Sequence, residues 1–148
     1  MEIVGERVVK APREAVWAAL NDPEVLKACI MGCEAIEQHS ETELNATVVA
    51  RFGPVKATFN ADITLEDLSP PASYRLVGQG QGGIAGFAKG GAAITLDEVD
   101  DGTLLRYNAD MAVGGKLAQV GSRLVGSTTK KLIASFFDAL DAHLEAEA

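Results

Sequence analysis

Three segments of the chain alternate hydrophobic and polar residues with a period of two. They are residues 43–53, 55–67 and 103–113, and the sequence FGPV between the first two is a turn signal that predicts a hairpin. One dry face and one wet face are typical of antiparallel sheets. We expect Lys56, Thr58 and Asn60 to face solvent, and the following residues to face inward: Ala57, Phe59, Ala61, Ile63, Leu105, Tyr107, Ala109, Met111 and Val113.

Residues 77–96, VGQGQGGIAGFAKGGAAITL, contain the spacing G-x-G-x-x-G at Gly78, Gly80 and Gly83. In a dinucleotide-binding fold a helix follows such a loop directly, and the N-terminus of that helix holds the pyrophosphate. Here Gly90 and Gly91 stand where the helix belongs, and the residues after them alternate as a strand. We therefore interpret the spacing as a coincidence and expect no nucleotide cofactor.

The glycines instead share a face with alanines on two predicted strands, residues 74–82 and 86–96. If these strands pair, their inner face is bulky at one end and nearly bare at the other. Two interpretations stay open: the bare patch leaves room for a ligand, a helix or a backbone, or the glycines permit strong curvature and bulges. The two faces consist of Tyr74, Leu76, Gly78, Gly80 and Gly82, and of Gly86, Ala88, Gly90, Ala92, Ile94 and Leu96.

Helical spacing appears on either side of these strands. Residues 11–20 begin with Pro12 in the first turn, and residues 22–29 begin with Asp22 as a predicted N-cap. Residues 116–145 predict one long amphipathic helix, which must bury its apolar stripe against the dry face of the sheet. This order of elements is typical of an α+β fold with space for a cavity between sheet and helix. The expected stripe is Leu117, Val120, Leu124, Thr128, Leu132, Phe136, Leu140 and Leu144.

Three stretches together resemble the carbon monoxide dehydrogenase G-subunit (CoxG) family of the START-like (SRPBCC) helix-grip superfamily. They are GERVVKAPREAVWAALNDPEVLKACIMGCE, residues 53–92 with GQGQGGIAGFAKGGA, and VGGKLAQVGSRLVG. The resemblance covers nearly the whole chain. It implies a curved seven-stranded antiparallel sheet around a long C-terminal helix, with two short helices after the first strand and a hydrophobic cavity between sheet and helix.

The resemblance also implies a function. Such proteins are accessory to molybdenum-containing CO dehydrogenase-type oxidoreductases, and are linked to membrane association and to lipid-like ligands such as quinones. This chain departs from the family at Met31-Gly32-Cys33, where relatives usually read P-G-C. It also ends in DAHLEAEA, where many relatives continue into an apolar or amphipathic tail, so we expect no anchoring tail here.

Composition narrows the classes of partner. The chain has 148 residues and a net charge of −8, with no internal repeat or linker, so we expect one domain over residues 1–148. The negative charge argues against nucleic-acid partners and against unspecific attraction to anionic bilayers. The N-terminus has no secretory signal, and no apolar run approaches the roughly 18–20 residues of a membrane span. We expect a cytoplasmic protein, with a peripheral position at the inner face of the membrane left open.

Few residues suggest catalytic or metal chemistry. Cys29, Cys33 and His39 lack a fourth ligand and do not match zinc spacings, so we expect two thiols and no metal. His143 lies in an acidic turn, and the carboxylates lie on polar faces. Lys89, Lys116 and Arg123 are expected near the cavity mouth, where they could contact a polar head group. The inward-facing polar candidates are Tyr74, Tyr107 and Thr128.

These observations predict a non-catalytic protein that binds a hydrophobic, lipid-like molecule, with a quinone as candidate, in an internal cavity. By the resemblance, its partners are the subunits of a CO dehydrogenase-type molybdenum hydroxylase. Two alternatives remain open: a START-like cyclase or hydrolase acting on a small apolar substrate, and an assembly or recruitment factor without ligand. The expected ligand-binding residues are Phe52, Phe59, Gly80, Phe87, Ala92, Met111, Leu117, Val120 and Leu124.

Overall fold

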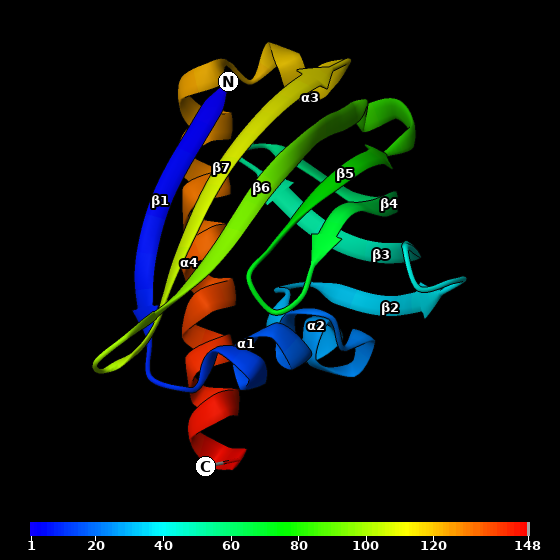
Figure 1. The fold of residues 1–148 in the computed structure, drawn as a ribbon. Helices are drawn as coiled ribbons and strands as arrows, with labels where there is room; N and C mark the ends of the chain where they lie inside the picture. The colour runs from blue at the N-terminus through cyan, green and yellow to red at the C-terminus, as the bar shows by residue number, and fades with distance from the viewer. Residues whose placement is uncertain (148) are drawn as a thin grey trace.

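Seven antiparallel strands form one curved sheet that wraps around a long helix (Figure 1). The computed structural model describes residues 1–147. Across the sheet the strands follow the order β1-β7-β6-β5-β4-β3-β2, so every neighbour except the β1–β7 pair is consecutive in sequence. The strands are β1 (Glu2–Val9), β2 (Cys33–Gln38), β3 (Glu43–Phe52), β4 (Val55–Ser69), β5 (Ser73–Gln81), β6 (Phe87–Val99) and β7 (Gly102–Gly114).

Two short helices and one long helix complete the fold. Helices α1 (Arg13–Leu20) and α2 (Pro23–Cys29) follow β1, and α3 (Lys116–Gln119) and α4 (Ser122–Glu147) follow β7. Pro12 occupies the N-cap of α1, and the Asp22 carboxylate caps α2 by accepting a hydrogen bond from the Glu24 amide at 3.0 Å. In Figure 1, α1 and α2 lie at the end of the sheet nearest the C-terminal half of α4, and α3 lies at the opposite end.

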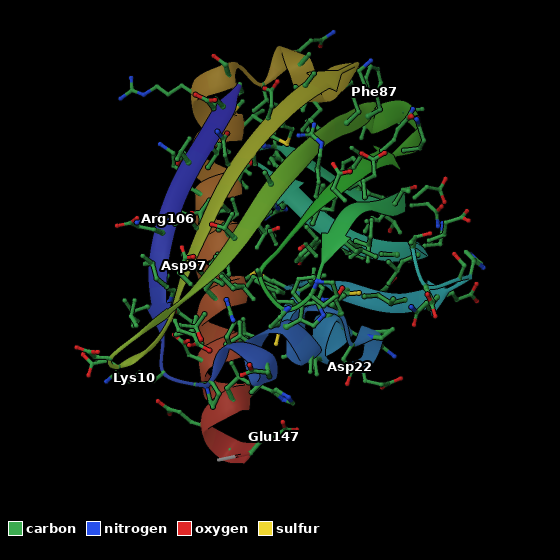
Figure 2. All side chains as sticks on the ribbon, in the orientation of Figure 1. Lys10, Asp22, Phe87, Asp97, Arg106 and Glu147 are labelled. Carbon is green, nitrogen blue, oxygen red and sulfur yellow. The ribbon has the colours of Figure 1, made fainter. Side chains whose placement is uncertain are left out.

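The predicted alternation is confirmed on β4 and β7. Phe59 and Leu105 are buried, whereas Lys56, Thr58, Asn60, Arg106 and Asn108 are exposed. On the outer face Arg106 lies 3.8 Å from Asp97 of β6, and Figure 2 shows both side chains on the side of the sheet away from α4. The alternation is legible in the sequence because only one face of this sheet is dry.

The two glycine-rich strands pair in the expected register, with Tyr74 opposite Ile94, Leu76 opposite Ala92 and Gly78 opposite Gly90. The short 3-10 helix η1 (Gly83–Ala85) connects them, so the G-x-G-x-x-G spacing belongs to an antiparallel hairpin. A Cβ on Gly90 would collide with the backbone carbonyl of Asp110 on β7. Glycine is needed there because the neighbouring backbone approaches too closely for a side chain.

The predicted single helix over residues 116–145 is divided in two. Gly121 has φ +101°, a conformation that ends α3 and starts α4 in a new direction. The predicted stripe is right at Leu117, which is fully buried, and wrong at Leu124, which is 39% exposed while Val125 is fully buried. A step of four residues overshoots a helical turn by about 40°, so residues four apart from Leu124 to Leu144 drift by roughly 200° around the helix. The buried residues of α4 are Val125, Phe137, Leu140 and Leu144.

The hydrophobic interior consists of two clusters at opposite ends of the groove between sheet and α4. The larger one packs α1, α2 and the C-terminal half of α4 against the sheet, around Val16, Leu96, Leu105 and Leu140. The smaller one, here called the α3-end cluster, consists of the buried residues Phe52, Phe59, Leu117 and Val125 with partly buried neighbours. Between the two clusters the groove is not completely filled.

Candidate functional site

A cavity of about 370 Å³ lies between the concave face of the sheet and α4. Its volume is near the lower end of the range of about 300–1,000 Å³ typical of small-molecule sites. The wall comes from α2, from β2 to β7 and from the middle of α4. The lining residues are Leu20, Asn21, Leu26, Ile30, Met31, Ile36, Gln38, Leu44, Ala46, Val48, Ile63, Leu65, Tyr74, Leu76, Ala92, Ile94, Tyr107, Ala109, Thr129, Leu132, Ile133, Phe136 and Phe137.

The space of the cavity lies over positions where the inner face of the sheet carries alanine. Ala92 of β6 pairs with Ala109 of β7 and with Leu76 of β5, and Ala46 of β3 pairs with Ala61 of β4. A larger side chain at Ala46, Ala92 or Ala109 would extend into the space between sheet and helix. The cavity therefore exists because a few positions on an otherwise bulky inner face carry alanine in place of a larger side chain.

The glycines of the inner face have a different role from these alanines. A Cβ on Gly82 would overlap the ring of Phe59, and a Cβ on Gly114 would overlap the ring of Phe87. Aromatic side chains thus fill the space over those two glycines. The close approach of an aromatic ring explains Gly82 and Gly114, and the close approach of a backbone, one of the possibilities left open by the sequence, explains Gly90.

Tyr74 of β5 is the most deeply buried polar side chain of the wall, at 5% exposure. Its ring meets the edge of Trp17 at 5.2 Å between centroids. No hydrogen bond joins the Tyr74 hydroxyl to any residue in the described range 1–147. Burial raises the pKa of this phenol well above its ordinary value, so the hydroxyl keeps its proton and remains a hydrogen-bond donor.

The other interior polar groups already have contacts within the protein. The Asn21 side-chain amide donates to the Trp17 carbonyl at 3.0 Å, and the Thr129 hydroxyl donates to the Val125 carbonyl at 2.8 Å. The hydroxyl of Tyr107 lies against Gly5 of β1, and its ring stacks on Phe137 at 5.6 Å. Thr129 rather than the predicted Thr128 lines the cavity, because the inward face of α4 is rotated from the expected stripe.

The cavity opens between the α2–β2 segment and α4. Met31 is 57% exposed and Gln38 is exposed, while Leu26 and Ile30 are half-buried beside them. This rim carries apolar side chains and one amide. The predicted head-group contacts Lys89, Lys116 and Arg123 do not line the cavity.

One of the nine predicted ligand-binding residues, Ala92, lines the cavity, and the other eight lie elsewhere. Phe52, Phe59 and Leu117 are buried in the α3-end cluster, with Met111 and Val120 packed against it. Phe87 stands at the start of β6 near α3 (Figure 2), where its ring lies over Gly114. Leu124 packs beside Gly53, and Gly80 faces Ala61 and Phe59. The structure therefore does not bring the nine residues together around this cavity, since several of them pack against one another at the α3 end of the groove.

Sequence reasoning missed the contribution of α2 and β2 to the wall. Ile30, Met31, Ile36 and Gln38 form one side of the mouth, yet residues 33–38 show no clear alternation. A register shift between Cys33 and Ala35 breaks the period of two in β2. The available signal was the pair of isoleucines on either side of that irregular segment.

The two thiols are separate from the cavity chemistry. Cys29 is buried, Cys33 is partly buried, and desolvation raises the pKa of both thiols. Within residues 1–147 no three His, Cys, Asp or Glu side chains gather in a way that could hold a metal ion. His143 lies 3.3 Å from Glu147 on α4.

Solved structures of the same architecture cover almost the whole chain. A conserved protein from Geobacillus kaustophilus is 34% identical over 99% of this chain and 96% of its own, with a TM-score of 0.92. A protein from Thermus thermophilus (18% identity, 100% and 99% coverage, TM-score 0.74) shares the fold, as does the ZhuI aromatase/cyclase from a Streptomyces species (12%, 98% and 93%, 0.70). These likenesses establish the START-like helix-grip fold.

The sequence matches no curated protein, but it matches the model of one family. None of the helices within residues 1–147 has the length and apolar character needed to cross a membrane. The model of the CoxG family, the G-subunit of carbon monoxide dehydrogenase, matches residues 5–145, which is almost the entire fold described above. The chain therefore belongs to the carbon monoxide dehydrogenase CoxG family.

Proposed function

We propose that this protein is a non-catalytic carrier of a hydrophobic, lipid-like molecule, with a quinone as candidate, and that it serves a molybdenum-containing CO dehydrogenase-type oxidoreductase. The observation that carries the proposal is the apolar cavity between the sheet and α4. Burying an apolar ligand there removes hydrophobic surface of both partners from water, which contributes about 25 cal/mol per Å². The family description supports the choice of partner enzyme.

The lining supports a binding role over catalysis. Among the described lining residues there is no Asp, Glu, His, Lys, Arg or Cys. General acid–base and nucleophilic catalysis at neutral pH depend on such groups. The remaining polar side chains are two amides, one threonine and two phenols. An enzyme of the cyclase type would have to work with Tyr74 and Tyr107 alone, so we place that function second.

Native mass spectrometry of the protein purified from its own organism tests the carrier role. We expect a retained hydrophobic molecule that organic solvent extracts unchanged. A converted product that accumulates with time would instead favour an enzyme. If the protein retains no bound molecule and does not bind added menadione, a neutral quinone probe, the assembly-factor alternative remains.

Trp17 provides a direct signal for the same test, because the protein has one tryptophan and its ring contacts Tyr74 in the cavity wall. Quinones quench tryptophan fluorescence on close approach, so menadione bound in the cavity should quench Trp17. Ala92→Phe should fill the cavity and abolish quenching. Ala93→Phe is the matched control, since Ala93 is the next residue of β6 and its side chain is exposed on the outer face.

The partnership requires a separate measurement. We expect purified CO dehydrogenase-type hydroxylase from the same organism to bind this protein in a defined stoichiometry by analytical ultracentrifugation. Absence of binding with a ligand-loaded carrier would contradict the proposed partner and leave ligand binding unaffected.

A further inference from the structure

The Tyr74 hydroxyl belongs to the most deeply buried polar side chain of the cavity wall and has no hydrogen-bond partner in the described protein. Tyr74 is 5% exposed and lines the cavity. A wall hydroxyl without a partner in the protein is free to donate to whatever occupies the cavity. A ligand oxygen in the cavity would supply the missing partner.

The neighbouring polar groups cannot take this role equally well. The Thr129 hydroxyl donates to the Val125 carbonyl, and the half-buried Asn21 amide donates one of its two N–H groups to the Trp17 carbonyl. The Tyr107 hydroxyl also forms no hydrogen bond with the described residues, but it lies over Gly5 of β1. Gln38 is exposed at the rim, where water competes for its amide. Tyr74 is therefore the donor that a molecule inside the cavity meets.

None of the described residues that line the cavity carries a positive charge. The titratable groups behind the lining include the Cys29 thiol in the adjoining core and Arg7 of β1 with its two carboxylate partners, and the α2–β2 segment at the mouth carries Lys27 beside Cys33. Arg7 packs over the ring of Phe137 at 5.9 Å and is already paired with Asp138 at 2.6 Å and Asp141 at 2.7 Å. A ligand carboxylate would thus lose its hydration with no free positive charge to replace it.

We propose that the cavity selects an uncharged ligand with an oxygen acceptor, such as a ketone or quinone carbonyl, and that the Tyr74 hydroxyl donates a hydrogen bond to this oxygen. This selectivity rests on the proposed function, since it specifies the chemistry of the ligand that the carrier holds. It excludes fatty acids and other anionic lipids as ligands at neutral pH. With a cavity of about 370 Å³, a long tail would have to extend through the mouth beside Met31.

Three probes with the same number of carbon atoms test the charge selection: undecane, methyl nonyl ketone and undecanoic acid. Their affinities are measured by displacement of menadione, with Trp17 fluorescence as the readout. We expect the ketone to bind equally at about pH 7.5 and about pH 5.5. The acid should bind roughly 100-fold more tightly at the lower pH, because the neutral fraction of a carboxylic acid of ordinary pKa rises tenfold per pH unit.

Two variants test the hydrogen bond. Tyr74→Phe keeps the ring that contacts Trp17 and removes the hydroxyl. It should therefore weaken the binding of the ketone by about 3- to 10-fold and leave the affinity for undecane unchanged. Tyr107→Phe is the matched control, because Tyr107 also lines the cavity but its hydroxyl faces Gly5. We expect the ketone affinity of Tyr107→Phe to equal that of the native protein.

The outcomes separate this inference from the carrier role. If the acid binds as tightly as the ketone at both pH values, or if Tyr74→Phe leaves the ketone affinity unchanged, the inference is wrong while the cavity remains a ligand site. If none of the three probes displaces menadione and the native protein retains no ligand, the carrier role and the inference fail together. Equal losses of ketone affinity in Tyr74→Phe and Tyr107→Phe would also overturn the assignment of Tyr74 as the hydrogen-bond donor.

Discussion

Gly5 and Tyr107 are paired residues on β1 and β7, and the phenol of Tyr107 occupies the space that a side chain on Gly5 would need. A Cβ on Gly5 would overlap both the hydroxyl and the ring of Tyr107. The same ring stacks on Phe137 of α4 at 5.6 Å, which joins the edge of the sheet to the helix beside the cavity. Glycine at this position therefore determines where one wall of the cavity stands.

Gly5→Ala should destabilise the protein by about 1–3 kcal/mol, the usual cost of overpacking, because the added methyl group displaces Tyr107 from Phe137. Urea unfolding followed by circular dichroism gives the free energy of unfolding. Val4→Ala is the control, since Val4 is 64% exposed on the opposite face of the same strand. Equal stability of Gly5→Ala and the native protein would show that Tyr107 moves without cost.

Two glycines near the start of α4 should respond oppositely to alanine. Gly121→Ala should cost about 1–3 kcal/mol, because φ +101° is unfavourable for a residue with a Cβ. Gly126→Ala should stabilise the helix by up to about 1 kcal/mol, because Gly126 lies in the helix interior. The nearest obstacle at Gly126 is the flexible Met1 sulfur, 3.3 Å from the new Cβ. Thermal unfolding measures both changes, and a shift of the same sign in both variants would contradict this account.

Phe59 should prove to be a residue of the core rather than of the ligand site. Its ring packs edge-on to Phe52 at 6.3 Å within the α3-end cluster, which lies outside the cavity. We expect Phe59→Leu to reduce the free energy of unfolding by about 1.5 kcal/mol and to leave menadione affinity unchanged. A loss of affinity in the folded variant would mean that the ligand reaches the α3 end, as the sequence suggested.

The two cysteines should react slowly with iodoacetamide. Desolvation raises the pKa of both thiols above the ordinary value of about 8.5, so less than about 3% is thiolate at pH 7. Because the thiolate is the reactive form, the alkylation rate should increase as the pH rises towards the raised pKa. Intact-mass measurements should show Cys33 modified before the buried Cys29.

Cys33→Ser is the control for this assignment, since it should remove the faster phase and leave the slower one. Rapid double modification at pH 7 would show that the α2–β2 segment opens readily. That result would also bear on ligand entry, because the mouth of the cavity adjoins this segment.

The sequence predicted the parts of the fold that depend on a simple period. Alternation on residues 55–67 identified which face of β4 points inward, and the small-residue face of 74–82 and 86–96 predicted the pairing of β5 with β6. Both predictions succeeded because one face of the sheet is exposed to solvent. The polar residues therefore indicate which side chains of each strand point outward.

The position of the cavity could not be predicted in the same way. It depends on which parts of a continuous apolar groove are filled, and therefore on contacts between residues distant in sequence. The ring of Phe59 lies over Gly82, and that of Phe87 over Gly114, so both occupy space that the glycines had suggested for a ligand. Likewise, the break at Gly121 and the rotation along α4 determine that Val125 rather than Leu124 faces the sheet.

The ion pair between Arg7 and Asp138 also has a consequence for biosynthesis. The two residues are 131 positions apart in the chain, and the residues that pair between β1 and β7 are 94 to 108 positions apart. At about 5–20 residues per second, the ribosome needs roughly 5–22 s to reach the partners of β1 on β7 and roughly 7–26 s to reach Asp138. The hydrogen-bonding edge of β1 has no strand to pair with until β7 has been made, and α4 covers the concave face only later. A nascent chain therefore exposes the walls of the cavity to the translation machinery, and the cavity is complete only after the last helix has emerged.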